Sequence, residues 1–148
     1  MQYPLEEKIG RPDLLVGREK EFANFNKWIS RIPGKLSKSR VILARRKSGK
    51  TSFVQRIFNQ LWSANGEVIP FYFVFEGKNI WQPNLAVNYY RAFASQYIAF
   101  FERDAELVGK PLSLEQIRAY GETKGIQALI DDVDSLQQDE AHGRYDLM

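Results

Sequence analysis

Cysteine is absent from this sequence of 148 residues, and His142 is its only histidine. The lack of cysteine excludes a disulfide framework and thiolate metal sites, and one histidine leaves no set of imidazoles for a metal. No apolar run approaches the roughly 20 residues that span a bilayer, and the first residues lack the basic and apolar segments of a secretory signal. We therefore expect a soluble, cytoplasmic protein that uses no membrane.

Acidic side chains are missing from Phe22 to Gly66, although this stretch carries ten lysines and arginines. The whole chain has a net charge of only +3, so the imbalance lies in the distribution of charge. A basic centre suits a polyanionic ligand, either the phosphates of a nucleotide or a nucleic acid. The alternative is a basic face that is simply solvated.

Hydrophobic residues make up 44% of the chain and aromatic residues 14%, enough for a buried core. Apolar residues recur at helical spacing over about 19–32, where Trp28 belongs to the stripe, and over 53–62 and 84–104. Asn65 and Gly66 form a stop signal after the second of these predicted helices. The β-prone apolar runs 41–43 and 67–75 predict two buried parallel strands.

The C-terminal third of the chain predicts two more helices. Ser113 and Gln116 have the spacing of a capping box, which starts a helix that runs through Tyr120. Gly121 and Gly125 bracket a predicted turn, and an apolar stripe over 126–136 predicts the last helix.

The most informative motif is Ala-Arg-Arg-Lys-Ser-Gly-Lys-Thr at 44–51, between the first predicted strand and the following helix. It matches the phosphate-binding pattern Gly-x4-Gly-Lys-Ser/Thr except at its first position. In such a loop backbone N–H groups surround an anion, the lysine reaches the terminal phosphates and the hydroxyl binds magnesium. The predicted nucleotide-binding residues here are Ala44, Arg45, Arg46, Lys47, Ser48, Gly49, Lys50, Thr51 and Ser52, with Thr51 as the Mg²⁺ ligand.

Ala44 is the departure from the pattern. If this position requires a positive φ angle, alanine costs roughly 1 kcal/mol, whereas an extended angle makes the change nearly free. The bland alternative for the whole motif is a basic strand–helix connection that binds nothing in particular.

A second segment, Leu15-Val16-Gly17-Arg18-Glu19-Lys20-Glu21-Phe22, stands about 25 residues ahead of the motif. Together the two resemble archaeal-type and STAND ATPases, relatives of the AAA+ group, whose phosphate loop often carries an arginine pair. The resemblance covers roughly residues 14–75. It implies a P-loop ATPase domain that binds ATP and Mg²⁺, with Val16 and Gly17 near the adenine and Lys50 and Thr51 at the phosphates and magnesium.

The same family also needs an apolar strand that ends in acidic residues. Asp131 and Asp132, after Leu129 and Ile130, are the only candidates for this catalytic role. Gln127 interrupts the apolar run, and the stripe continues with helical period, so we favour an exposed helix face over a magnesium site. Binding of ATP is therefore expected, but efficient hydrolysis is not.

The fold class implied is α/β, a P-loop NTPase-like parallel sheet with flanking helices. Only two strands can be placed, so the expected sheet is incomplete and the chain would be the N-terminal portion of a single domain. Its parts are an adenine-side segment and helix (14–34), a strand-loop-helix-strand core (41–75) and a helical region (84–137). An unfinished sheet exposes an edge and apolar faces, which predicts a protein partner or self-association.

Two other functions remain open from the sequence. One is a nucleic-acid-binding module, whose affinity would be spread over many cations and would fall steeply with salt. The other is a non-enzymatic fragment whose aromatic helices dock on another protein. The cations that would serve nucleic acid are Lys35, Lys38, Arg40, Arg45, Arg46 and Lys47.

Overall fold

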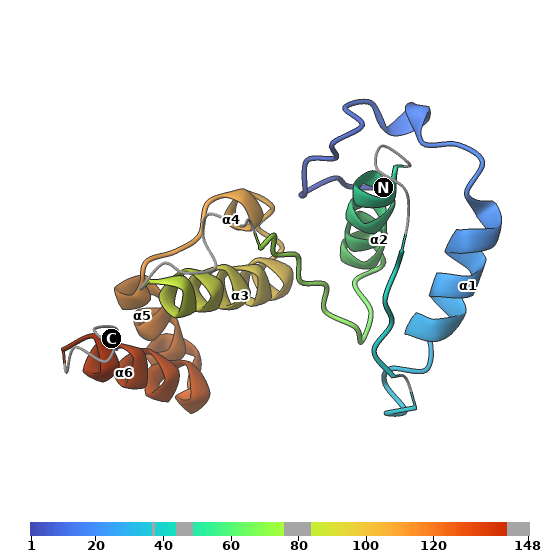
Figure 1. Cartoon of the computed structure of the whole chain (residues 1–148). Helices are drawn as coiled ribbons and strands as arrows, with labels where there is room; N and C mark the ends of the chain where they lie inside the picture. Colours follow the sequence, from blue (N-terminus) through green and yellow to red (C-terminus); the bar gives the residue numbers. More distant parts are fainter. Residues whose placement is uncertain (37, 44–48, 76–83, 142–148) are drawn as a thin grey trace. The chain divides into compact units, whose positions relative to one another are not determined.

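The computed structural model describes residues 1–36, 38–43, 49–75 and 84–141, which form helices and irregular segments (Figure 1). The chain divides into two compact units, Met1–Pro70 and Phe71–Met148. The first unit holds η1 (Pro12–Leu14), α1 (Glu19–Ile29) and α2 (Lys50–Ala64). The second holds α3 (Leu85–Glu102), α4 (Glu106–Gly109), α5 (Leu114–Lys124) and α6 (Gln127–Ala141).

In the first unit, α1 and α2 pack through the apolar stripes that the sequence predicts. Ile29, Phe53 and Ile57 are buried together. The ring of Phe53 lies 4.7 Å from that of Phe22 and 5.7 Å from that of Phe25, as measured between centroids. Helix α1 ends about three residues earlier than predicted, whereas the predicted stop of α2 is confirmed by Asn65, a left-handed C-cap with φ 49°.

The opposite, polar face of α2 receives the N-terminal segment of the chain. The backbone of Gln2, Leu5 and Lys8 bonds in turn to side chains of α2, over 2.7–3.0 Å. These acceptors are spaced along one helical face, since Gln55, Asn59 and Ser63 follow one another at intervals of four. The N-terminal segment therefore lies along α2 and is held there by hydrogen bonds.

A buried ion pair lies at the centre of this contact. Glu7, which is only 5% exposed, accepts hydrogen bonds from Nε and Nη2 of Arg56 at 2.7 and 2.9 Å. Asn59 donates to the same carboxylate at 3.2 Å. The bond from Glu7 raises the pKa of Arg56 above its usual value, despite the opposing effect of desolvation. Both charges are thus paired and hydrogen-bonded, as burial requires.

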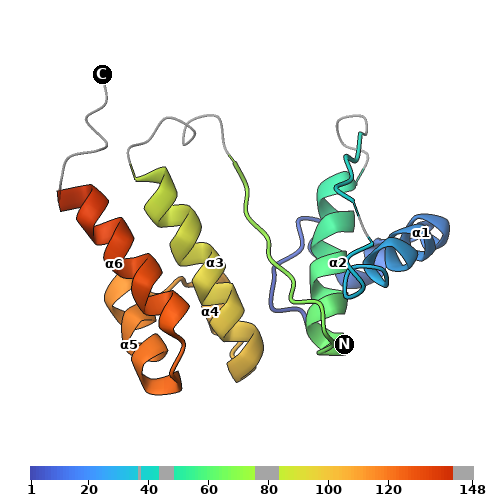
Figure 2. The same ribbon diagram turned by 90° about the horizontal axis from the view of Figure 1, so that it is seen from below.

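The second unit is built on the hairpin of α5 and α6, with α3 packed against it (Figures 1 and 2). The capping box predicted at Ser113 and Gln116 is confirmed. Gly121 lies inside α5, not in a turn, and the turn comes at Gly125 with φ 71°. A Cβ on Gly121 would lie 3.0 Å from the carbonyl oxygen of Ile126, so glycine permits the close approach of the two helices.

The expected α/β fold with a parallel sheet is wrong, because no β-strand occurs among the described residues. The run 41–43 makes no ladder, and Val41 and Leu43 are 82% and 89% exposed. A β-prone run becomes a strand only when a neighbouring backbone pairs with it. Three residues without such a neighbour remain irregular.

The second predicted strand, 67–75, is irregular for a different reason. The backbone N–H and carbonyl of Tyr72 bond to the side-chain amide of Gln96 on α3, at 2.9 and 2.8 Å. The rings of Phe71 and Phe73 pack on Tyr89 of the same helix, with centroids 5.4 and 5.1 Å apart. A helix side chain thus takes the place that a partner strand would have.

Replacing Glu7 with glutamine should remove about 3 kcal/mol from the free energy of unfolding, because the guanidinium of Arg56, whose side chain is only 11% exposed, loses its countercharge. Urea denaturation followed by circular dichroism measures the loss. The matched control is Glu6→Gln, since Glu6 is exposed. Equal stability of the two variants would contradict this role for the ion pair.

Replacing Gly121 with alanine should destabilise the chain by roughly 1–3 kcal/mol, because the new methyl group overpacks the α5–α6 contact. Gly109→Ala is the control in the same unit, where a Cβ meets nothing within 4 Å. Thermal unfolding of both variants compares them, and a shift no larger than that of the control would argue against close packing at Gly121.

Candidate functional site

The residues expected to bind nucleotide are described only in part. Ala44, Arg45, Arg46, Lys47 and Ser48 lie outside the described residues. Gly49 is the N-cap of α2, and Lys50, Thr51 and Ser52 form its first turn. The motif therefore does lead into a helix, as its pattern requires, but it does not follow a strand.

Gly49 adopts the left-handed conformation, with φ 83° and ψ 12°. This conformation is accessible to glycine without the penalty that a Cβ carries. A Cβ on Gly49 would lie 3.5 Å from Nη2 of Arg18, the N-cap residue of α1. The structure thus brings the guanidinium group of Arg18 to the N-terminus of α2.

The electrostatics of this helix start favour an anion. Backbone N–H groups of a first turn carry partial positive charge, which acidic side chains usually offset. The first turn of α2 contains no acidic residue and begins with Lys50. Arg18 adds a second cation, partly balanced by Glu21 at 3.6 Å. An external anion would relieve the repulsion between these positive groups.

Val16 and Gly17, expected beside an adenine, form the approach to α1. Val16 is 75% exposed, so it lines no enclosed base pocket in the described structure. Gly17 has φ 75°, and this left-handed turn directly precedes Arg18. The turn at Gly17 therefore affects the direction in which the side chain of Arg18 points.

Asp131 and Asp132 lie within α6, in the second unit, and both are exposed. Asp131 accepts a hydrogen bond from Gln127 at 2.9 Å, one helical turn earlier. The prediction that these two residues lie on an exposed helix face is confirmed, and neither carboxylate lies at the end of a strand. In the described part of the chain no group of three or more histidine, aspartate or glutamate side chains could hold a metal.

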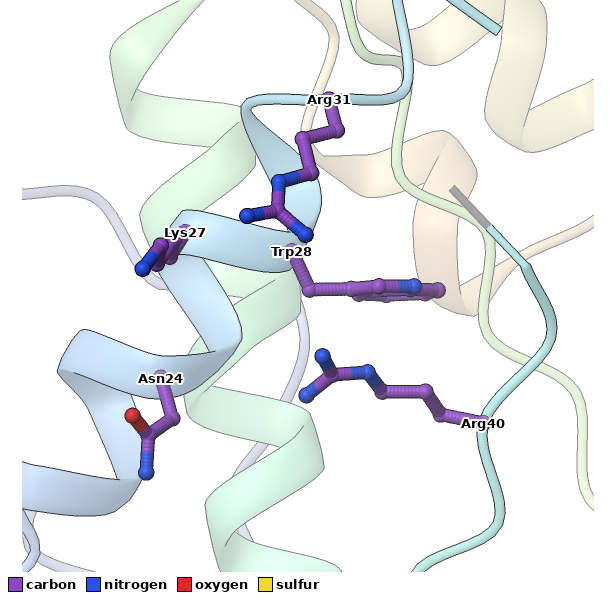
Figure 3. Close-up of a pocket in the computed structure, with 5 residues that line it drawn as sticks. All are labelled: Asn24, Lys27, Trp28, Arg31 and Arg40. Carbon is purple, nitrogen blue, oxygen red and sulfur yellow. The ribbon is translucent and has the colours of Figure 1, made fainter. Parts of the chain in front are cut away.

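A second basic site occurs at the C-terminal end of α1. There a pocket of about 280 Å³ is lined by two arginines, a lysine, an asparagine and an indole, which Figure 3 shows in close-up. The lining residues are Asn24, Lys27, Trp28, Arg31 and Arg40. A neighbouring pocket shares Trp28, Arg31 and Arg40 and extends to Lys38 and Ser39. None of these side chains is acidic.

Trp28 organises this second site. Its indole Nε1 donates a 2.7 Å hydrogen bond to the carbonyl of Lys38, which holds the returning chain against α1. The guanidinium carbon of Arg40 lies 5.8 Å from the centroid of the indole, within the range of a cation–π contact. In Figure 3, Arg31 and Arg40 stand on opposite sides of the indole plane.

Sequence reasoning missed Arg18 and the part of this pocket that residues 24–31 supply, although it named Lys38 and Arg40 among the cations that would serve nucleic acid. Trp28 was assigned only to the apolar stripe of the first helix, although its indole serves both the core and the pocket. The signal was present, because positions 24, 27, 28 and 31 share one helical face and carry three polar donors around an aromatic. Arg40 comes from a separate segment and could not be placed by periodicity.

No described helix is long and apolar enough to cross a membrane. Comparisons of the chain with protein-family models, with curated proteins and with solved structures find no match. The resemblance to archaeal-type and STAND ATPases is therefore corrected, since neither a family match nor a sheet in the described residues supports a P-loop ATPase domain. The chemistry of the site must be argued from its own residues.

Replacing Gly49 with alanine should lower the free energy of unfolding by about 1 kcal/mol, because alanine is strained at φ 83°. Chemical denaturation measures the change. Gly66→Ala in the same unit is the control, since a Cβ there meets nothing within 4 Å. A neutral effect at Gly49 would show that the helix start relaxes to an ordinary backbone angle.

Proposed function

We propose that the first unit binds the phosphates of a nucleoside triphosphate, ATP with Mg²⁺, at the N-terminus of α2. The observation that carries the proposal is the position of the Arg18 guanidinium beside left-handed Gly49, at the start of a 15-residue helix. A helix whose first turn begins with a lysine, contains no acidic residue and lies beside an arginine is suited to an anion with several charges.

Each group has a separate task in this proposal. The N–H groups of the first turn of α2 bind phosphate oxygens, and Gly49 leaves room for their approach. Lys50 supplies a flexible point charge, whereas the planar guanidinium of Arg18 can bond to two oxygens at once. The two cations come from different helices, so a bound phosphate would also tie α1 to α2.

Magnesium would arrive with the phosphates. The hydroxyl of Thr51 is the only protein ligand assigned to it, and Mg²⁺ commonly keeps several waters and binds through substrate phosphates.

Binding is proposed without hydrolysis. Activation of an attacking water needs a positioned base or carboxylate, and Asp131 and Asp132 are exposed on a helix of the second unit. We also propose that the protein is cytoplasmic, as the sequence leads us to expect.

Lys50→Ala should weaken binding of a non-hydrolysable ATP analogue with magnesium at least tenfold, because a charge-assisted contact to phosphate is lost. Arg18→Gln should weaken it severalfold. Isothermal titration calorimetry on the full chain measures both, with circular dichroism as the test that the variants fold. Inorganic triphosphate should bind through the same residues, since the proposed contacts are to phosphate.

The control is Lys110→Ala, which removes one exposed cation that belongs to neither basic site. Its affinity for the analogue should equal that of the unaltered chain. If Lys50→Ala binds as tightly as Lys110→Ala, nucleotide does not bind at the start of α2.

A further inference from the structure

The pocket around Trp28 is independent of the α2 site and has its own chemistry. Its lining offers three cationic side chains and one amide, and the adjoining pocket adds Lys38. Nothing acidic lines either pocket, and no acidic residue occurs from Phe22 to Gly66. A ligand that fits must therefore carry negative charge and hydrogen-bond acceptors.

The indole of Trp28 at the centre of the pocket restricts further which ligands can fit. An anion alone would be served by the arginines and the lysine, without an aromatic surface between them. Trp28 is held in place by its bond to the carbonyl of Lys38 and by packing on Phe25, with ring centroids 5.0 Å apart. A fixed indole flanked by guanidinium groups is a surface on which a flat heterocycle stacks, with phosphates on the surrounding cations.

The basic surface is longer than one pocket. The pocket of about 280 Å³ adjoins a second of about 320 Å³, which shares Trp28, Arg31 and Arg40 and extends to Lys38 and Ser39. One unit of a polymer can enter while its neighbours follow this surface.

We propose that the pocket formed by Trp28, Arg31 and Arg40 binds single-stranded nucleic acid. One base stacks on the indole in place of, or against, the Arg40 guanidinium, and the adjacent phosphates contact Lys27, Arg31 and Lys38. A single strand fits better than a duplex, because duplex bases are already stacked on one another and present no free face to an indole. This inference does not depend on nucleotide binding at α2.

The test is fluorescence anisotropy of the full chain with a labelled oligothymidylate of about 20 nucleotides, at about 50 and 200 mM salt. The double variant Arg31→Gln, Arg40→Gln changes only exposed side chains, so it should fold. We expect it to bind at least tenfold more weakly and to reduce the slope of log affinity against log salt by about 2. Lys110→Gln, an exposed cation of the second unit, should change neither quantity.

Stacking is tested separately from charge. Trp28→Phe keeps an aromatic ring in the core. Its affinity for oligothymidylate should fall severalfold, and the part of the tryptophan fluorescence quenching that comes from Trp28 should be lost. Lys50→Ala should keep the affinity for oligothymidylate, which separates this site from the α2 site.

Three results would overturn the inference. The first is an affinity for the double variant equal to that of Lys110→Gln. The second is binding of a duplex or of polyglutamate as tight as that of the single strand, which would show general attraction of anions. The third is unchanged binding and quenching in Trp28→Phe.

Discussion

The first unit depends on one requirement, that the charges of Glu7 and Arg56 be paired where they are buried. The pair is bidentate, and Asn59 completes the hydrogen bonds of the carboxylate. Any other register of the N-terminal segment on α2 would leave one of these charges without its partner, which is strongly destabilising. The segment is therefore held in one register. The same helix packs its opposite face on α1. Helix α2 therefore connects the N-terminal segment, α1 and the predicted phosphate-binding residues at its own start.

Basic side chains of the first unit gather at two separate places. At the start of α2, Lys50 and Arg18 act with backbone dipoles, which suits a compact cluster of phosphates. At the end of α1, cations surround an aromatic ring, which suits a flat base with phosphates on either side. Cations are common to both places. The second place also holds an indole fixed by Lys38 and Phe25, which offers a flat surface for stacking.

The missing sheet shows how a strong local preference can be overridden. Residues 71–75 have the composition of a buried strand, and their alternate rings do pack on one helix. Backbone hydrogen bonding decides the state, however, and here the side-chain amide of Gln96 satisfies Tyr72. In the second unit, the close contact of α5 with α6 is made possible by Gly121, which sequence reasoning placed in a turn. The first outcome follows from a neighbour 24 positions away along the chain, and the second from residues of the next helix that fold back onto Gly121.

The sequence by itself determined the helices, because helical periodicity and caps are local. It placed the stripes of α1 and α2, the capping box at Ser113, the left-handed stop at Asn65 and the helical character of Asp131 and Asp132. It also located the motif residues that begin α2. Only the tertiary structure decided the absence of strands in the described residues, the pairing of Glu7 with Arg56 and the meeting of Arg18 with Gly49. These features join residues some 24 to 49 positions apart, and no periodicity reports which distant side chain will satisfy a buried charge or a backbone amide.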